Sequence, residues 1–253
     1  MHSFQRLAGV ACGAAALLAF GAGPALAASG SVNANLNPIE GSEVDGSGTA
    51  MVKVNGTTIT VTMAAQGLLA DQPHAAHIHF GADARHECPT LGDDSDDNGQ
   101  LNTTEGAPAY GPIVVSLTKT GDTSPDSALA VDRFDTAEGG EISYQRGSIK
   151  VESGVAEAIA AGESVVVIHG VDHNHDGKYS GEEKSDLDES LPTEATDPAL
   201  CGVLAKAPNG GMDTGSGGAA AGQNTALIAL GGGALLAAAG SGALAARRAR
   251  TQV

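Results

Sequence analysis

The sequence predicts an all-β fold, an antiparallel sandwich or barrel that carries one short helix. In residues 49–63, TAMVKVNGTTITVTM, apolar and polar residues alternate on both sides of Asn55-Gly56, a dipeptide favoured in two-residue hairpin turns. Short runs of the same kind recur along the chain with turn residues between them, which is typical of antiparallel sheets. The 253 residues include 36 glycines and only 3% aromatics, so the fold is expected to be rich in turns and small side chains.

Six further runs are expected to form strands. They are SVNANLN (31–37), AAHIHFG (75–81), PIVVSLTK (112–119), EISYQRG (141–147), SVVVIHG (164–170) and LCGVLAK (200–206). The segment GVAEAIAAG (154–162) is the expected helix, with Gly162 at its end. The polar segments 82–111 and 171–198 are predicted as loops, and loops of such length are usually functional or disordered.

The beginning of the chain has the pattern of a secretory signal peptide. Residues 1–28 combine a short charged start, an apolar run and the small-residue sequence Ala25-Leu26-Ala27. Cys12 lies inside this segment and is expected to be removed with it. The sequence therefore predicts an exported protein.

The end of the chain predicts an anchor. Residues 225–246 are apolar, uncharged and long enough to cross a bilayer, and the basic residues of 247–253 favour the cytoplasmic side. A Gly/Ser/Ala-rich linker, 208–224, would join this span to an exported domain at 29–207. Because GGMDTGSGG before the span resembles part of a Gram-positive cell-wall sorting signal, both membrane-retained and wall-linked anchoring stay open. A soluble tail helix is the alternative to a span.

Charge and cysteines narrow the function classes. The chain has 30 acidic and 13 basic residues and a formal net charge of −17, which suits cations and disfavours nucleic acid or anionic membrane surfaces as partners. Cys88 and Cys201 are the cysteines left after processing, and outside the cytoplasm two cysteines most often form a disulfide. Two free buried thiols are the alternative.

Histidines cluster in one strand. His77 and His79 are two residues apart, so they share a face of the strand, and His169 ends another apolar strand. Neutral imidazoles in this arrangement are good ligands for copper or zinc. His74 and His86 flank the first pair and are further candidate ligands. Hydrogen-bonded structural histidines at the mouth of a sandwich are the alternative.

These segments resemble two known families. HIHFG, ESVVVIHG and LCGVL resemble pieces of the copper/zinc superoxide dismutases, and the step from His79 to Cys88 fits that family. The segment from NPIEGSEVDGSGTAMVKVNG to AAHIHFG is more similar still to the CHRD domain, a secreted β-domain first described in chordin. The resemblance covers about residues 33–205. It implies a superoxide-dismutase-like, Ig-like β-sandwich, copper ligation by His77, His79 and His169, and a Cys88–Cys201 disulfide.

The sequence departs from the dismutase pattern elsewhere. No histidine follows Cys88 where the bridging imidazole is expected, and the later zinc histidines have no counterparts. TDPAL (196–200) stands where an arginine would guide superoxide. A copper-only site is compatible with these departures, whereas efficient dismutation is not expected.

Two acidic loops fit the EF-hand calcium pattern D-x-[DN]-x-[DN]-G-x5-E, in which oxygens at positions 1, 3 and 5 and a glutamate at position 12 converge on one cation. The first loop would use Asp94, Asp96, Asn98, the Gln100 carbonyl and Glu105, and the second Asp172, Asn174, Asp176, the Lys178 carbonyl and Glu183. No helix pair flanks them, and solvated acidic turns are the alternative.

Together these features predict an envelope-anchored module that binds copper or zinc through histidines and calcium through acidic loops. A copper-only, superoxide dismutase-like enzyme is the alternative function, and a structural or adhesion module stiffened by calcium alone is a third. No catalytic residue is assigned, and the sequence names no protein partner.

Overall fold

A computed structural model describes residues 27–206 of the chain. Almost all of the predicted signal peptide, together with the linker, the apolar span and the basic tail, lies outside these residues. Within 27–206, no helix combines the length and the hydropathy that a membrane crossing requires.

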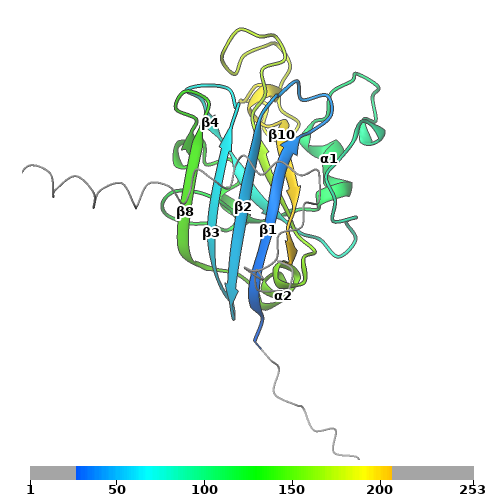
Figure 1. The fold of residues 1–253 in the computed structure, drawn as a ribbon. Coiled ribbons are helices and arrows are strands. Elements are labelled where there is room, and N and C mark those ends of the chain that lie inside the picture. Colours follow the sequence, from blue (N-terminus) through cyan, green and yellow to red (C-terminus); the bar gives the residue numbers. More distant parts are fainter. Residues whose placement is uncertain (1–26, 207–253) are drawn as a thin grey trace, which may run out of the picture. The chain divides into compact units, whose positions relative to one another are not determined.

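A large antiparallel sheet makes up most of the described chain (Figure 1). Its strands follow the order β6-β5-β9-β10-β1-β2-β3-β8, and β11 also pairs with β1. Their bounds are β1 (Ser29–Pro38), β2 (Ser47–Asn55), β3 (Thr58–Gln66), β5 (Ala76–His79), β6 (Ile113–Ser116), β8 (Ile142–Lys150), β9 (Val165–His169), β10 (Pro198–Val203) and β11 (Ala205–Lys206). A second, two-stranded sheet pairs β4 (Pro73–His74) with β7 (Asp135–Thr136).

The sheet curls around a core that both of its halves share. In β3, alternate residues such as Ile59, Val61 and Met63 are buried, as the period of a strand requires. These side chains belong to the same apolar cluster as Ile78 of β5 and Val166 of β9, at the other end of the strand order. Long β1 joins the halves, since it pairs with β2 along most of its length and with β10 at Asn37–Pro38.

The predicted antiparallel β fold and the hairpin are confirmed, with a shift of one residue in the turn. Asn55 pairs with Thr58, so the two turn residues are Gly56 and Thr57, not Asn55 and Gly56. Gly56 has a φ of 61°, which a glycine at the first central position of a hairpin turn adopts without steric cost.

Two α-helices are present in the described residues where one was expected. The predicted helix is α2 (Ser153–Ala161), which ends at Gly162 in the left-handed conformation. The additional helix, α1 (Thr103–Tyr110), lies inside the segment 82–111 that was predicted as a loop. The described residues also form short 3-10 helices, which are η1 (Leu91–Asp93), η2 (Pro125–Ser127), η3 (Val131–Arg133) and η4 (Thr193–Ala195).

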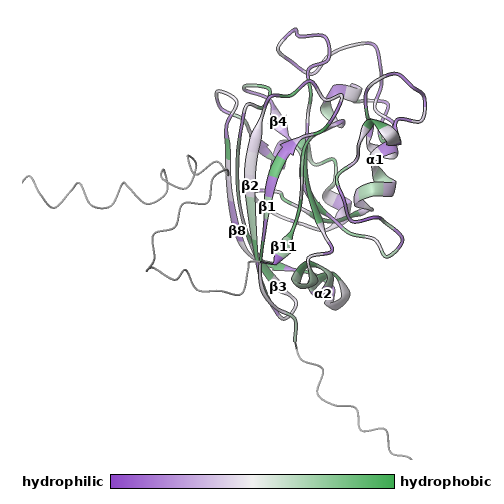
Figure 2. Ribbon diagram, turned by 45° about the vertical axis from the view of Figure 1, so that its right-hand side comes forward, coloured by the Kyte–Doolittle hydropathy of each residue, from purple (hydrophilic) through white to green (hydrophobic). Residues whose placement is uncertain are grey.

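Strands β5, β9 and β10 are buried on both faces. Ile78 and Ile168 point into the main core, whereas Val165, Val167 and Cys201 pack with Leu101 and Tyr110 in a second cluster on the other face. Figure 2 shows α1 and the long loops on the side of the molecule away from β2, β3 and β8. The loops therefore turn the outer face of β5 and β9 into an interior, and the clustered histidines lie there.

Candidate metal centre

His77, His79 and His169 meet on the covered face of β5 and β9. The antiparallel register pairs His77 with Val167 and His79 with Val165, so both histidines share a face with the end of β9. One ring nitrogen from each of the three histidines lies within 4.8 Å of the others, and the side chains are only 3%, 1% and 2% exposed. The sequence placed these residues on the right faces, and the fold brings the two strands together.

Each of the three imidazoles donates one hydrogen bond to a backbone carbonyl. Nδ1 of His79 lies 2.8 Å from the Gly111 oxygen, Nδ1 of His169 lies 2.6 Å from the Thr196 oxygen, and Nε2 of His77 lies 3.1 Å from the Ala128 oxygen. A carbonyl oxygen only accepts, so these nitrogens carry the protons.

The other three ring nitrogens are left with free lone pairs. Nδ1 of His77, Nε2 of His79 and Nε2 of His169 are buried and have no hydrogen-bond partner. Buried polar atoms are rarely left unsatisfied, and three in one cluster need an explanation. Fixing one nitrogen by a backbone carbonyl while the other faces a metal is the usual arrangement of ligating histidines.

The electrostatic surroundings keep the three rings neutral. Burial lowers the pKa of His79 to about 3 and that of His169 to about 4. Burial also lowers the pKa of His77 well below its ordinary value, and repulsion by the neighbouring imidazoles lowers it further. Neutral imidazole is the ligand form, so the triad needs no deprotonation near pH 7 before it binds a metal.

Aromatic side chains fix the triad from the sides. The ring of Tyr110 lies 4.4 Å from that of His79 between centroids, and Phe134 lies edge-on to His77 at 5.3 Å. Both aromatic residues are fully buried. Tyr110 donates to the Thr103 carbonyl and packs against Gly106, so α1 sets its position.

The structure places His74 and His86 outside the triad. Both ring nitrogens of His74 face carbonyl oxygens, Nδ1 that of His169 and Nε2 that of Leu69, and the Tyr179 hydroxyl lies 3.2 Å from Nδ1. His86 contacts the Gly81 oxygen and stacks on Phe80. The groups of potential ligands found among the described residues contain neither histidine, and these contacts suit structural roles.

Three of the predicted ligands of the first acidic loop lie close together. Oxygens of Asp94, Asp96 and Glu105 lie within 4.8 Å of one another. The Gly99 N–H donates to Oδ2 of Asp94 and the Gln100 N–H to Oδ1 of Asn98, so the loop closes on its own side-chain oxygens. Oδ1 of Asp94 is buried and has no partner.

Glu105 has two roles in this loop. Its Oε1 accepts from the N–H and hydroxyl of Ser95, and its Oε2 accepts from the N–H of Asn102, the N-cap of α1. Burial raises the pKa of Glu105, but these hydrogen bonds outweigh it and hold the pKa below its ordinary value. The carboxylate is therefore charged although the residue is only 7% exposed.

The second acidic loop repeats the hydrogen bonds of the first. The Gly177 N–H donates to Asp172, the Asp176 N–H to Asn174, and the Lys178 N–H to Asp176. His175 at position 4 has a φ of 57°, as Asp97 has 58° at position 4 of the first loop. Positions 1 to 7 of the two loops therefore form the same turn.

The predicted last ligand of the second loop is Glu183. Its side chain is exposed and lines a polar pocket that includes Asp96 and Asp197. Glu194 is 3% exposed and accepts from the N–H groups of Asn174 and Ser180 of this loop. Ser180 is at position 9, as Asn102 is in the first loop, so its hydrogen bond to Glu194 matches the one between Asn102 and Glu105.

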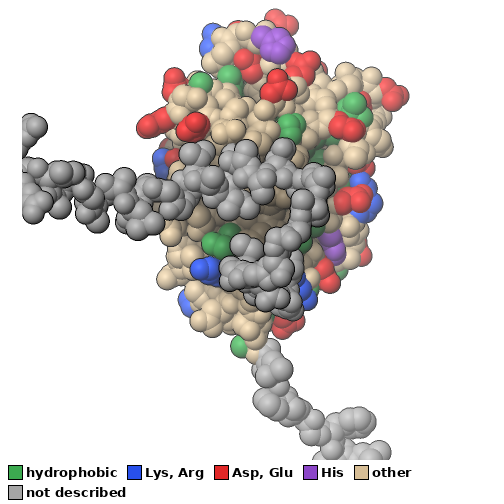
Figure 3. Space-filling model, in the orientation of Figure 1, with side chains coloured by type: hydrophobic (Ala, Val, Ile, Leu, Met, Phe, Trp, Pro, Cys, Tyr) green, Lys and Arg blue, Asp and Glu red, His purple; other side chains and the backbone are tan. Residues whose placement is uncertain are grey.

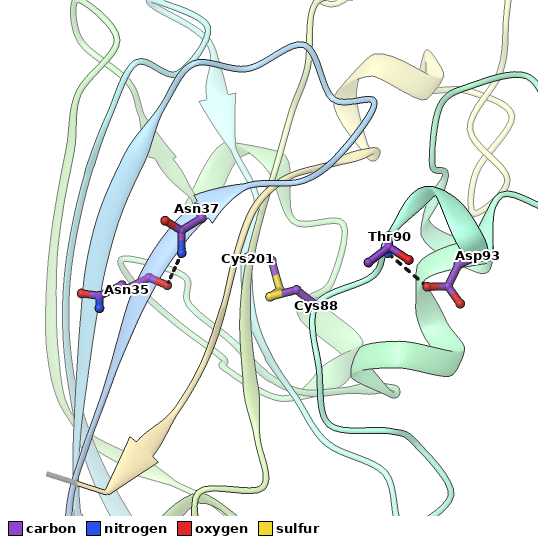
Figure 4. Close-up of a disulfide and its surroundings, with 6 residues drawn as sticks. All are labelled: Asn35, Asn37, Cys88, Thr90, Asp93 and Cys201. Carbon is purple, nitrogen blue, oxygen red and sulfur yellow. Dashed lines mark hydrogen bonds between the residues drawn. A yellow bond between two sulfur atoms is a disulfide. The ribbon is translucent and has the colours of Figure 1, made fainter. Parts of the chain in front are cut away.

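The predicted disulfide between Cys88 and Cys201 is present (Figure 4). Cys201 belongs to β10 and Cys88 precedes α1, so the bond ties the segment that carries the first acidic loop to the sheet. The bond spans 113 residues, and it is expected to contribute about 4–5 kcal/mol by restricting the unfolded chain.

Some residues of the site carried no recognisable signal in the sequence. The carbonyls that orient the triad belong to Gly111, Ala128 and Thr196, and a backbone carbonyl leaves no mark on residue type. α1 had a signal that was overlooked: Asn102 and Glu105 form a capping box, the usual start of a helix. Glu194 could not be predicted from the calcium-loop pattern, because the pattern that begins at Asp172 ends at Glu183.

Comparison with known protein families and with curated proteins found no match.

Proposed function

We propose that this protein binds one copper ion through His77, His79 and His169. The observation that carries the proposal is the set of three buried, unpartnered ring nitrogens whose opposite nitrogens are all held by backbone carbonyls. Without a metal, each free nitrogen is a desolvated acceptor that receives nothing, which costs about 1–3 kcal/mol per group. A metal ion supplies the missing partner to all three.

Copper suits this donor set better than the other common divalent metals. Imidazole ligands accept copper, zinc, iron and nickel, and Cu²⁺ binds a given nitrogen site more tightly than Zn²⁺ does. Three histidines with a fourth position open are also used for zinc. Zinc is therefore the competing occupant that the experiment has to separate from copper.

The resemblance to CHRD domains and to superoxide dismutase-like sandwiches supports the same assignment. We place the protein in the cell envelope, exported by its first segment and anchored by its last. The disulfide supports an oxidising compartment, since such bonds are rare in the cytosol. The acidic composition supports a role with cations, and Figure 3 shows acidic side chains spread over the visible protein surface.

Elemental analysis tests the proposal. The full-length protein, isolated without a histidine tag from an oxidising compartment, is expected to hold close to one copper per chain when both metals are offered. The double variant His77→Gln/His79→Gln is expected to lose it. His175→Gln is the matched control, because the His175 side chain is 73% exposed and lies outside the triad. Equal metal content in all three proteins would refute the proposal. One zinc per chain, in place of copper, would show that the triad is a zinc site.

The same material tests the enzymatic alternative. Superoxide turnover that needs added copper and vanishes in His169→Ala would make the protein a dismutase-like enzyme. Tight copper binding without turnover would leave it a binding module.

A second binding function, for calcium, is proposed for the acidic loops. Oδ1 of Asp94 is buried and unpartnered, and one oxygen of Asp94 lies within 4.8 Å of oxygens of Asp96 and Glu105; both observations favour a cation there. Carboxylate and amide oxygens on a tight loop are calcium ligands. Isothermal titration with Ca²⁺ tests it, and a protein that binds calcium but no copper would be the calcium-stiffened module.

A further inference from the structure

A small pocket opens beside the histidine triad, and its wall is apolar. His77 and His169 line it together with Leu129, Val131, Leu187 and Leu191. None of the described residues that line it is aspartate, glutamate, lysine or arginine. Val131 and Leu187 are 36% and 44% exposed, so these two apolar side chains belong both to the wall of the pocket and to the surface.

The polar groups of the wall are already used. The Thr103 hydroxyl donates to the Thr196 carbonyl, and the Thr196 hydroxyl contacts Ser185. The ring N–H of His77 donates to the Ala128 carbonyl, and that of His169 donates to the Thr196 carbonyl; both carbonyls belong to lining residues. A ligand inside the pocket therefore finds few donors or acceptors besides a metal at the triad.

Size and charge restrict the ligand further. The cavity volume is about 20 Å³, counted as space open to the centre of a water-sized sphere. A single water needs about 10–15 Å³ on that measure, so the pocket suits a molecule of one or two heavy atoms. The wall also offers no counter-charge, so an anion that entered would lose its hydration without gaining an ion pair.

We propose that this pocket admits a small neutral molecule, of the size and polarity of dioxygen or carbon monoxide, to the side of the triad formed by His77 and His169, and that it disfavours anions. The inference rests on the proposed metal function and names its ligand class. It also explains why the cationic guidance expected of an enzyme that acts on superoxide is missing from this pocket. Leu187 and Val131 are assigned as the residues that set this selectivity.

The pocket itself is tested on the metal-free, full-length protein. Dissolved dioxygen is paramagnetic, so it is expected to broaden the methyl resonances of Leu129 and Leu191 more than those of exposed leucines. Leu187→Trp is expected to abolish this selective broadening. The control is Leu91→Trp, which changes another exposed leucine, 42% accessible and outside the pocket. Uniform broadening, or broadening that Leu187→Trp leaves intact, would overturn the inference whatever the fate of the metal proposal.

Access to the metal is tested on protein loaded with one equivalent of copper. Carbon monoxide is expected to bind the reduced form, detected by its infrared stretching band, and Leu187→Trp to lose that band. Azide is expected to bind the oxidised form weakly, and Leu187→Lys to speed its association about tenfold, since a cation at the entrance attracts anions. Tight azide binding to the unchanged protein, or no carbon monoxide band, would contradict the proposal. Absence of bound copper would instead count against the proposed function.

Discussion

The carbonyl oxygen of Gly111 accepts a hydrogen bond from Nδ1 of His79 over 2.8 Å. Gly111 ends α1 with a φ of 85°, and its own N–H caps the Ala107 carbonyl. A Cβ on Gly111 would lie 2.8 Å from the Gly81 nitrogen and 2.9 Å from the carbonyl carbon of Phe80, closer than such atoms approach. The end of a short helix thus holds a triad histidine, and only glycine fits there.

Gly111→Ala is therefore expected to weaken metal binding without removing a ligand. The shifted carbonyl releases His79, and loss of such an outer contact usually costs about 10–100-fold in metal affinity. Competition with a copper chelator measures this. Gly56→Ala is the control, because Gly56 also has positive φ but its Cβ would meet nothing within 4 Å. Equal affinities in the two variants would show that the Gly111 contact does not orient the ligand.

The triad makes the metal-free protein sensitive to acid. The pKa of His79 is about 3 in the folded protein, against an ordinary value near 6.5. Between these two values the imidazole is protonated in the unfolded chain and neutral in the folded one. Stability is then complete above pH 6.5 and falls as the pH drops toward 3. Between pH 7 and 5 the loss is expected to be about 2 kcal/mol for this histidine alone.

Denaturant unfolding of the metal-free protein at pH 7 and 5 measures the effect. His79→Gln is expected to lose about 2 kcal/mol less than the unchanged protein over this interval, because one buried neutral histidine is gone. His175→Gln, at an exposed site, is expected to keep the full loss. Parallel pH dependence in the unchanged protein and the His79→Gln variant would refute the buried, neutral triad.

Calcium is expected to raise the melting temperature through Asp94. Asp94→Asn removes the charge of the carboxylate whose Oδ1 is buried and unpartnered, so most of the calcium-dependent rise should disappear. Asp97→Asn is the matched control: Asp97 is exposed, stands at a non-ligand position of the loop and has a φ of 58°, which asparagine tolerates. An equal calcium response of both variants would argue against a cation in this loop.

Glu194, rather than Glu183, is expected to matter for the second loop. Glu194→Gln keeps the size of the side chain but weakens the acceptor for Asn174 and Ser180, and it is expected to lower both stability and calcium affinity. Glu183→Gln changes an exposed carboxylate and is expected to do neither. Calorimetric titration measures the calcium affinity of the two variants. A larger loss in Glu183→Gln than in Glu194→Gln would instead support Glu183, the ligand predicted from the loop pattern.

The sequence predicted the strands because their burial has a simple period. Val32, Ala34 and Leu36 alternate with exposed residues in β1, and α2 ends at the glycine that was expected to end it. His77 and His79 could be placed on one face by the same rule. Their meeting with His169 depends on β5 pairing with β9, which are far apart in sequence, and local patterns do not encode such pairing.

The parts that the sequence missed depend on contacts between distant segments. Glu194 reaches the second acidic loop because η4 follows a long excursion of the chain, so no fixed spacing predicts it. The two halves of the sheet are joined because β1 pairs with both β2 and β10, and this pairing is not a local property of the sequence. The carbonyls of Ala128 and Thr196 enter the site through loops whose path has no periodic signal.

The most direct test of the metal centre is a count of the nitrogen atoms bound to copper. X-ray absorption and electron paramagnetic resonance of the copper-loaded, full-length protein are expected to report three imidazole nitrogens and one open or water-filled position. Each single histidine-to-glutamine change in the triad is expected to reduce that number to two or to abolish binding, whereas His86→Gln is expected to leave it at three. Copper bound mainly by oxygen, or unchanged in the triad variants, would contradict the account.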